Sequence, residues 1–182
     1  MIRSMINVTA PLIVMPEQVV ISGDVTIFSA SGDATLLANW GRHFYVTSGS
    51  WLKLEGLALL NGHTNEVDGG GSVFANTGAY LELLSCLFQN CSVEEHAVND
   101  NYFVFGGTIA LSGATANIYN CSFITSTVST QAYKSPYGGT LSLIYDSTAN
   151  IRKCRFERST MSAAYYGWGG TISVFESSTA SF

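Results

Sequence analysis

Charged side chains are scarce in this chain of 182 residues, and their scarcity restricts what the protein can bind. Asp, Glu, Lys and Arg make up 12% of the sequence, about half their share in a typical soluble domain. Eight basic residues stand against thirteen acidic ones, which gives a net charge of −5 at pH 7. The basic residues form no stripe, so the composition argues against nucleic acid as a partner.

Long apolar runs and helical periodicity are also missing. No run of 18 apolar residues occurs, and the sequence therefore contains no candidate membrane-spanning helix. The first residues do not make a signal peptide, because the best apolar stretch, 11–16, is short and bracketed by prolines. No segment of ten or more residues keeps a 3.6-residue period. The chain is nevertheless 47% hydrophobic, which is enough for one domain with a sizeable core.

A short motif recurs through the chain, in which two glycines precede Ser or Thr and then an apolar residue. The pairs begin at Gly70, Gly106, Gly138 and Gly169, at steps of 36, 32 and 31 residues. A Cys-x-Phe piece follows the first three pairs after 16, 15 and 16 residues, at Cys86, Cys121 and Cys154. Self-similarity at such a period is typical of solenoids, in which each repeat is one structural unit.

Each repeat contains two short alternating runs, which predict strands. One follows the Gly-Gly pair, as in Ile109-x-Leu111, and the other ends at the Cys-x-Phe piece. A degenerate copy begins near Phe44, so residues 44–182 form repeats of 29–36 residues. Residues 1–43 are interpreted as irregular first coils, with strand-like runs at 12–14, 19–21 and 25–28.

The pattern resembles right-handed parallel β-helices of the pectin-lyase-like type, and more narrowly the repeats of polymorphic outer membrane proteins. Those repeats combine a Gly-Gly-Ala-Ile-like piece with a Phe-x-x-Asn piece. Here Ser or Thr replaces Ala, and Cys91, Ser126 and Ser159 stand where Asn is expected. We therefore predict an all-β fold, a right-handed parallel β-helix of about five to six coils in one domain, 1–182. Phe182 aligns with Ile151, so we expect the last coil to be incomplete and the chain to be a fragment of a longer protein.

An aromatic residue stands directly before three of the Gly-Gly pairs, at Phe105, Tyr137 and Trp168. These residues end the segments 89–105, 124–137 and 157–168, where the copies differ most and which we interpret as loops. If the three rings point outward, they form a row that stacks on sugar rings or on another apolar partner. If they point inward, they stabilise the fold by burial. They are the candidate binding residues.

The cysteines do not resemble a metal site. Cys86, Cys121 and Cys154 share a column with Leu57, which predicts buried thiols that act as small apolar residues. Disulfides between adjacent coils stay open as an alternative. Zinc sites use Cys-x-x-Cys pairs with nearby His, and this pattern is missing. We expect no metal and no cofactor.

The acidic residues give no clear catalytic motif. Enzymes of the pectin-lyase-like class, as the resemblance implies, cleave acidic polysaccharides with two or three converging carboxylates or with a calcium ion. None of the aspartates here is paired in sequence, although Asp68 and Asp100 lie at similar offsets before Gly-Gly. Two or three carboxylates about 5–9 Å apart in one groove would favour a glycosidase.

The leading hypothesis is a non-catalytic, adhesin-like scaffold that binds a polysaccharide or a surface protein through its aromatic loops. The alternative is a polysaccharide lyase or glycoside hydrolase of the pectin-lyase-like class. The resemblance also implies an extracellular or cell-surface location.

Overall fold

The computed structural model describes residues 4–66, 68–95, 103–130, 135–163 and 166–182. These residues contain 22 strands and no helix, and the strands form three long parallel sheets and one short one. Sheet A stacks Ser4–Asn7 (β1), Asp24–Phe28 (β4), Trp51–Glu55 (β7), Tyr80–Leu84 (β11), Thr115–Tyr119 (β15), Thr148–Arg152 (β19) and Thr179–Ser181 (β22). Sheet B stacks Leu12–Met15 (β2), Ala34–Ala38 (β5), Leu57–Leu60 (β8), Leu87–Glu95 (β12), Ser122–Thr130 (β16) and Arg155–Ser162 (β20), and His63–Thr64 (β9) pairs with β12. Sheet C stacks Val19–Ile21 (β3), Phe44–Val46 (β6), Val73–Ala75 (β10), Ile109–Ser112 (β14), Leu141–Ile144 (β18) and Ile172–Val174 (β21). Phe103–Phe105 (β13) pairs with Ser135–Tyr137 (β17) in the short sheet D.

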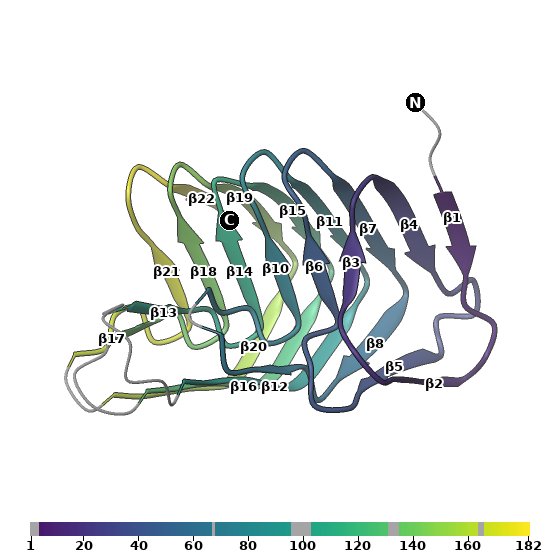
Figure 1. The fold of residues 1–182 in the computed structure, drawn as a ribbon, viewed down its shortest axis with the longest axis horizontal. Coiled ribbons are helices and arrows are strands. Elements are labelled where there is room, and N and C mark those ends of the chain that lie inside the picture. Colours follow the sequence, from purple (N-terminus) through teal and green to yellow (C-terminus); the bar gives the residue numbers. More distant parts are fainter. Residues whose placement is uncertain (1–3, 67, 96–102, 131–134, 164–165) are drawn as a thin grey trace.

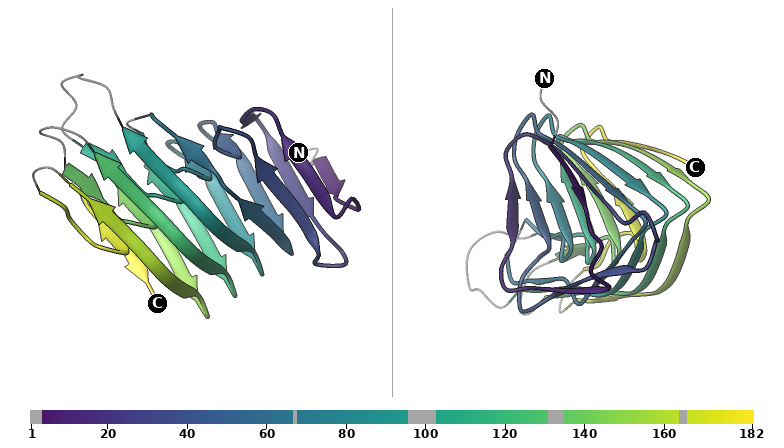
Figure 2. Two further views of the ribbon diagram at one scale, coloured as in Figure 1. Left: turned by 90° about the horizontal axis from the view of Figure 1, so that it is seen from below. Right: turned by 90° about the vertical axis from the view of Figure 1, so that its right-hand side faces the viewer.

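The chain visits sheets A, B and C in the same order in every coil, which makes the fold a parallel β-helix of about five turns. Figure 1 shows the coils side by side along the long axis, and the end-on view in Figure 2 shows their three sides. The predicted fold class is confirmed. The repeat alignment is confirmed as well, because Phe44, Val73, Ile109, Leu141 and Ile172 lie in one register column of sheet C.

Two expectations about regularity need correction. Strands within residues 4–43 keep a regular register with the next coil, because β1, β2 and β3 pair residue by residue with β4, β5 and β6. The segments interpreted as loops begin as strand, since β12, β16 and β20 continue past their Phe residues. A residue with positive φ interrupts each of these strands, at Asn90, Thr125 and Arg158. That interruption hides the alternation that would have revealed the rest of the strand.

The core is built from columns of equivalent inward side chains. Phe88, Phe123 and Phe156 stack almost parallel, with ring centroids 5.0 and 4.9 Å apart. This spacing follows the distance of about 4.8 Å between neighbouring strands. Leu54, Leu83 and their equivalents in β15 and β19 form a second inward column. Full burial of one such side chain contributes about 1.5–3 kcal/mol, so the stacked columns supply the main stabilisation.

The two glycines of the repeat have different tasks. Gly106 has a φ of 46° and turns the chain into sheet C. Gly107 lies where three main chains meet, since a Cβ atom there would stand 2.6 Å from the carbonyl oxygen of Thr127 and close to that of Gly139 in the next coil. The first glycine therefore permits the turn, and the second permits adjacent coils to stack.

We expect Gly107→Ala to lower the free energy of unfolding by at least about 2 kcal/mol, because the new methyl group would force two coils apart. Gly170 occupies the same repeat position in the last coil, but a Cβ atom there would meet nothing within 4 Å. Gly170→Ala is therefore the matched control and should change stability by no more than about 0.5 kcal/mol. Equilibrium urea unfolding measures both values. Equal losses in the two variants would contradict this account of the second glycine.

A buried polar seam runs along the corner between sheets B and C. Thr108 and Ser126 are buried, and their hydroxyl groups lie 2.7 Å apart. Thr140 and Ser159 repeat the contact at 2.6 Å. The Thr directly after Gly-Gly therefore hydrogen-bonds the Ser three residues after the Phe of the Cys-x-Phe piece. This contact links the two halves of the repeat. Small hydroxyl side chains fit this corner.

His43 begins the same seam. Its ring is fully buried between the Ser72 hydroxyl, 2.9 Å from Nδ1, and the Leu36 carbonyl, 3.0 Å from Nε2. A carbonyl only accepts, so Nε2 carries the hydrogen, and Nδ1 accepts from Ser72. Burial lowers the pKa of His43 to about 4. The folded protein therefore keeps a neutral imidazole at pH values where an unfolded chain would protonate it.

This difference makes stability depend on pH in a defined direction. The contribution is complete above the unfolded pKa of about 6.5 and is lost as the pH falls towards 4. Between pH 7.5 and pH 5, the free energy of unfolding should fall by about 2 kcal/mol. Urea unfolding at several pH values measures this slope. His43→Gln should remove it, whereas His63→Gln should retain it, and an unchanged slope in His43→Gln would refute the assignment.

Candidate functional site

The aromatic column of the sequence is mostly buried outside the main core. Phe105 and Tyr137 pair in register through β13 and β17, and Tyr137 forms a bridge with Trp168. The ring centroids of Phe105 and Tyr137 lie 5.6 Å apart, and those of Tyr137 and Trp168 lie 6.4 Å apart. The rings therefore form the row that the sequence indicates.

Two of the three rings face the protein. Phe105 and Tyr137 are 8% and 6% exposed, because they pack against Phe74, Ala110 and Ile144 on the outer face of sheet C. Trp168 is 55% exposed. Phe105 of β13 and Tyr137 of β17 thus cover part of the outer face of sheet C, and Trp168 alone of the three presents most of its ring to solvent. Tyr102, Tyr133 and Tyr165 lie outside the described residues.

A hollow of about 380 Å³ adjoins the exposed ring of Trp168. Tyr137 and Phe175 line it, together with residues of β21. Its walls are largely apolar. This is the part of the aromatic column that a ligand can reach.

Asp68, the one described member of the Asp68 and Asp100 pair, lies in an ion pair. Asp68 pairs with Arg42, whose Nη2 lies 2.5 Å from Oδ1, and Arg42 is only 4% exposed. The same guanidinium donates to the Gly69 carbonyl at 2.8 Å, and its centre lies 5.4 Å from the Phe74 ring. Asp68 therefore neutralises a buried cation beside the first Gly-Gly turn. Asp100 and His96 lie outside the described residues.

We expect Asp68→Asn to destabilise the fold by roughly 2 kcal/mol, because it leaves Arg42 buried without its counter-charge. This value lies below the range for fully buried pairs, since the Asp68 side chain is 34% exposed. Asp146→Asn, at an exposed turn, is the control and should be neutral within about 0.5 kcal/mol. Thermal and urea unfolding provide the comparison. An Asp68→Asn protein as stable as the control would assign Asp68 a different task.

Cys86, Cys121 and Cys154 are free thiols in the column that the sequence predicts, but Cys154 is only partly buried because it lies near the last coil. Cys86 and Cys121 are buried one above the other, and the Cys86 amide donates to the Cys121 sulfur at 3.5 Å. Cys91 is buried in the polar seam, and burial raises its pKa to about 11. Within the described part of the chain, no three His, Cys, Asp or Glu side chains gather closely enough to hold a metal ion.

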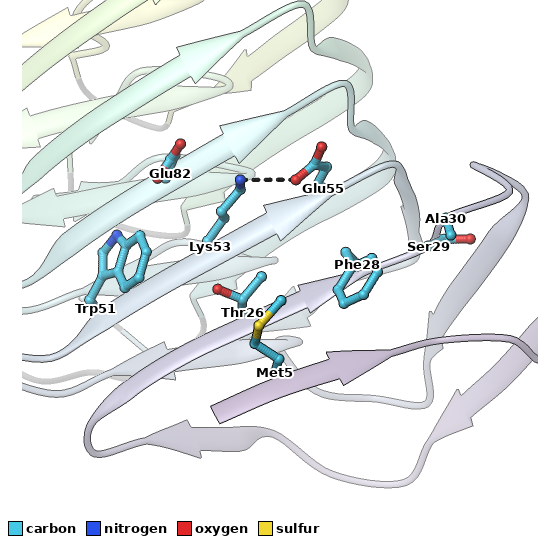
Figure 3. Close-up of a pocket in the computed structure, with 9 residues that line it drawn as sticks. All are labelled: Met5, Thr26, Phe28, Ser29, Ala30, Trp51, Lys53, Glu55 and Glu82. Atoms are coloured by element: carbon cyan, nitrogen blue, oxygen red, sulfur yellow. Dashed lines mark ion pairs between the residues drawn. The ribbon is translucent and has the colours of Figure 1, made fainter. Parts of the chain in front are cut away.

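A hollow with a mixed polar and aromatic lining lies on the outer face of sheet A. Its volume is about 690 Å³, and strands β1, β4, β7 and β11 form its floor. Figure 3 shows the side chains that project into it. They are Met5, Thr26, Phe28, Trp51, Lys53, Glu55 and Glu82, with Ser29 and Ala30 at one end.

Parallel register determines how these side chains are arranged. Trp51 lies beside Tyr80 of the next coil, with ring centroids 6.4 Å apart. Lys53 lies beside Glu82 in the adjacent column and forms an ion pair of 2.9 Å with Glu55 (Figure 3). The hollow thus offers an indole ring, one cation and two carboxylates on a flat, hydrogen-bonded floor.

Sequence reasoning did not single out these residues, although a signal was present. In Trp51-x-Lys53-x-Glu55, every second residue is large or charged, while Leu52 and Leu54 alternate inward. Alternation assigns the three residues to the outer face. The neighbours Thr26 and Glu82 follow only from the register between coils.

Comparison of the chain with family models, with curated proteins and with solved structures found no match. The sheet topology alone defines the class of the protein, which is the parallel β-helix. Since the described residues form only strands and turns, they include no helix with the length and apolarity needed to cross a membrane.

Proposed function

We propose that this protein is a non-catalytic β-helical binding module, and that the hollow on the outer face of sheet A holds an extended polysaccharide. The observation that carries the proposal is the placement of Trp51, Lys53, Glu55 and Glu82 in one hollow of about 690 Å³. An indole ring offers an apolar face for a sugar ring. Charged and hydroxyl side chains beside it can bond sugar hydroxyl groups, which both donate and accept.

The form of the hollow supports a chain-like ligand. Its floor crosses four strands that are fixed by parallel hydrogen bonds, so the side chains are held in position before binding. Preorganisation of this kind lowers the entropic cost of binding. The hollow is open rather than deep, which suits a long polymer better than a small molecule that must be enclosed.

A cell-surface or secreted role is part of the same proposal. It rests on the resemblance of the Gly-Gly and Cys-x-Phe pieces to pectin-lyase-like β-helices and to polymorphic outer membrane protein repeats. The low content of charged side chains and the net charge of −5 agree with a neutral or weakly polar partner.

A second candidate function follows from one specific feature. Glu55 and Glu82 line the same hollow, and two carboxylates on one sugar-binding surface are what a glycoside hydrolase uses. The ion pair with Lys53 favours binding over catalysis, because it engages one of the two carboxylates.

The test is a binding panel of neutral and acidic polysaccharides, with and without calcium, measured by affinity electrophoresis and calorimetry. We expect Trp51→Ala to weaken the best binder about 30-fold, the loss typical of a central aromatic contact of about 2 kcal/mol. Trp168→Ala is the matched control and should leave the affinity unchanged.

Two other results would redirect the proposal. Loss of binding in Trp168→Ala but not in Trp51→Ala would move the contact surface to the aromatic column. Release of new sugar ends by the wild type but not by Glu82→Gln would replace the binding module with a hydrolase or lyase.

A further inference from the structure

Trp40 occupies a conformation that bulky residues rarely adopt. Its φ is 65°, in the left-handed region, and its side chain is 88% exposed. Burial does not compensate for this conformation, since the ring lies almost entirely in solvent. Strained backbone that persists without a packing benefit tends to occur where a side chain must be presented to a ligand.

The ring stands at the edge of a hollow of about 490 Å³ on the outer face of sheet B. Aliphatic side chains from β2 and β5 form part of its floor. Its polar lining includes His63, Asn61, Asn90, Ser92 and Glu94. The hollow lies on a different side of the coil from the Trp51 surface, because sheets A and B are separate faces.

The polar wall is ordered by its own contacts. His63 Nδ1 lies 2.9 Å from the Ser92 hydroxyl, and its ring meets Trp40 edge to face at a centroid distance of 6.4 Å. The Asn90 side-chain amide donates to the Asn61 side-chain oxygen at 3.5 Å, and both residues have a left-handed backbone conformation. The two amides therefore stack in register and point their remaining donors and acceptors away from the core.

These features together select a class of ligand. No lysine or arginine lines the hollow in the described structure, so the described lining offers no cation to an anionic ligand. Paired amides and an imidazole supply both donors and acceptors, as a polyhydroxylated ligand requires. The exposed indole supplies a flat apolar face, and the volume lies within the range of small-ligand sites.

We propose that this hollow binds one or two rings of a neutral saccharide, with one ring stacked on Trp40 and its hydroxyl groups bonded by Asn61, Asn90 and His63. The site is separate from the sheet A surface and does not depend on it. It takes a short neutral ligand, whereas the sheet A hollow takes a polymer.

The experiment uses the three tryptophans as separate reporters. The chain contains three indole N–H groups, and the variants Trp40→Gly, Trp51→Ala and Trp168→Ala assign their NMR signals one by one. Neutral mono-, di- and trisaccharides are then titrated into the wild-type protein. We expect one class of them to shift the Trp40 signal in a saturable manner and to leave the other two in place.

Trp40→Gly separates a binding role from a structural one. Glycine adopts the left-handed conformation without strain, so we expect the thermal midpoint to stay equal or to rise while the saccharide affinity falls at least tenfold. Asn90→Ala should weaken binding as well, and Trp51→Ala should leave it unchanged. The proposal is overturned if no neutral saccharide moves the Trp40 signal, or if Trp40→Gly binds as tightly as the wild type. Polysaccharide shifts at the Trp51 signal report independently on the sheet A proposal.

Discussion

Hydrogen bonds between successive coils hold every strand in parallel register with its equivalents, about 4.8 Å away on either side. Each side chain therefore lies directly beside the same repeat position of the next coil. An inward ring packs on whatever stands at the same position of the next coil, as Phe88 does on Phe123. A corner that brings main chains this close together contains glycine, as at Gly107 and Gly139. The sequence repeats because successive coils must meet this geometric requirement.

The same register organises the polar interior. The hydroxyl pairs Thr108–Ser126 and Thr140–Ser159 occupy one seam, and His43 occupies its beginning with Ser72 as its partner. Beside it, Arg42 is buried against Asp68 and the Phe74 ring. Buried polar groups of this kind are costly unless they are paired. We infer that these pairs specify which corner residues face each other and thereby help to set the register of the coils.

On the outside, register converts ordinary surface residues into ordered rows. Trp51 and Tyr80 adjoin on sheet A, and Asn61 and Asn90 adjoin on sheet B. Rows on a hydrogen-bonded floor are rigid, which favours recognition of ligands over movement. The outer face of sheet C differs, because Phe105 of β13 and Tyr137 of β17 pack on it. Faces A and B therefore retain the open hollows that the two proposals use.

Much of the fold could be predicted from the sequence. The Gly-Gly steps, the Cys-x-Phe pieces and the alternating runs determined the β-helix, the alignment of its coils and the inward column that contains Cys86. These features are local or periodic, so they are visible in one dimension. The parts of β12 and β16 beyond Asn90 and Thr125 could not be predicted, because a single residue in left-handed conformation breaks the alternation. Only the tertiary structure decided whether Phe105 and Tyr137 face inward or outward. It also decided how Lys53 comes to lie between Glu55 and Glu82, and why Trp40 stands exposed beside His63. These arrangements depend on which side chains adjoin between coils, and the repeat motif does not reveal them because the residues involved differ from one coil to the next.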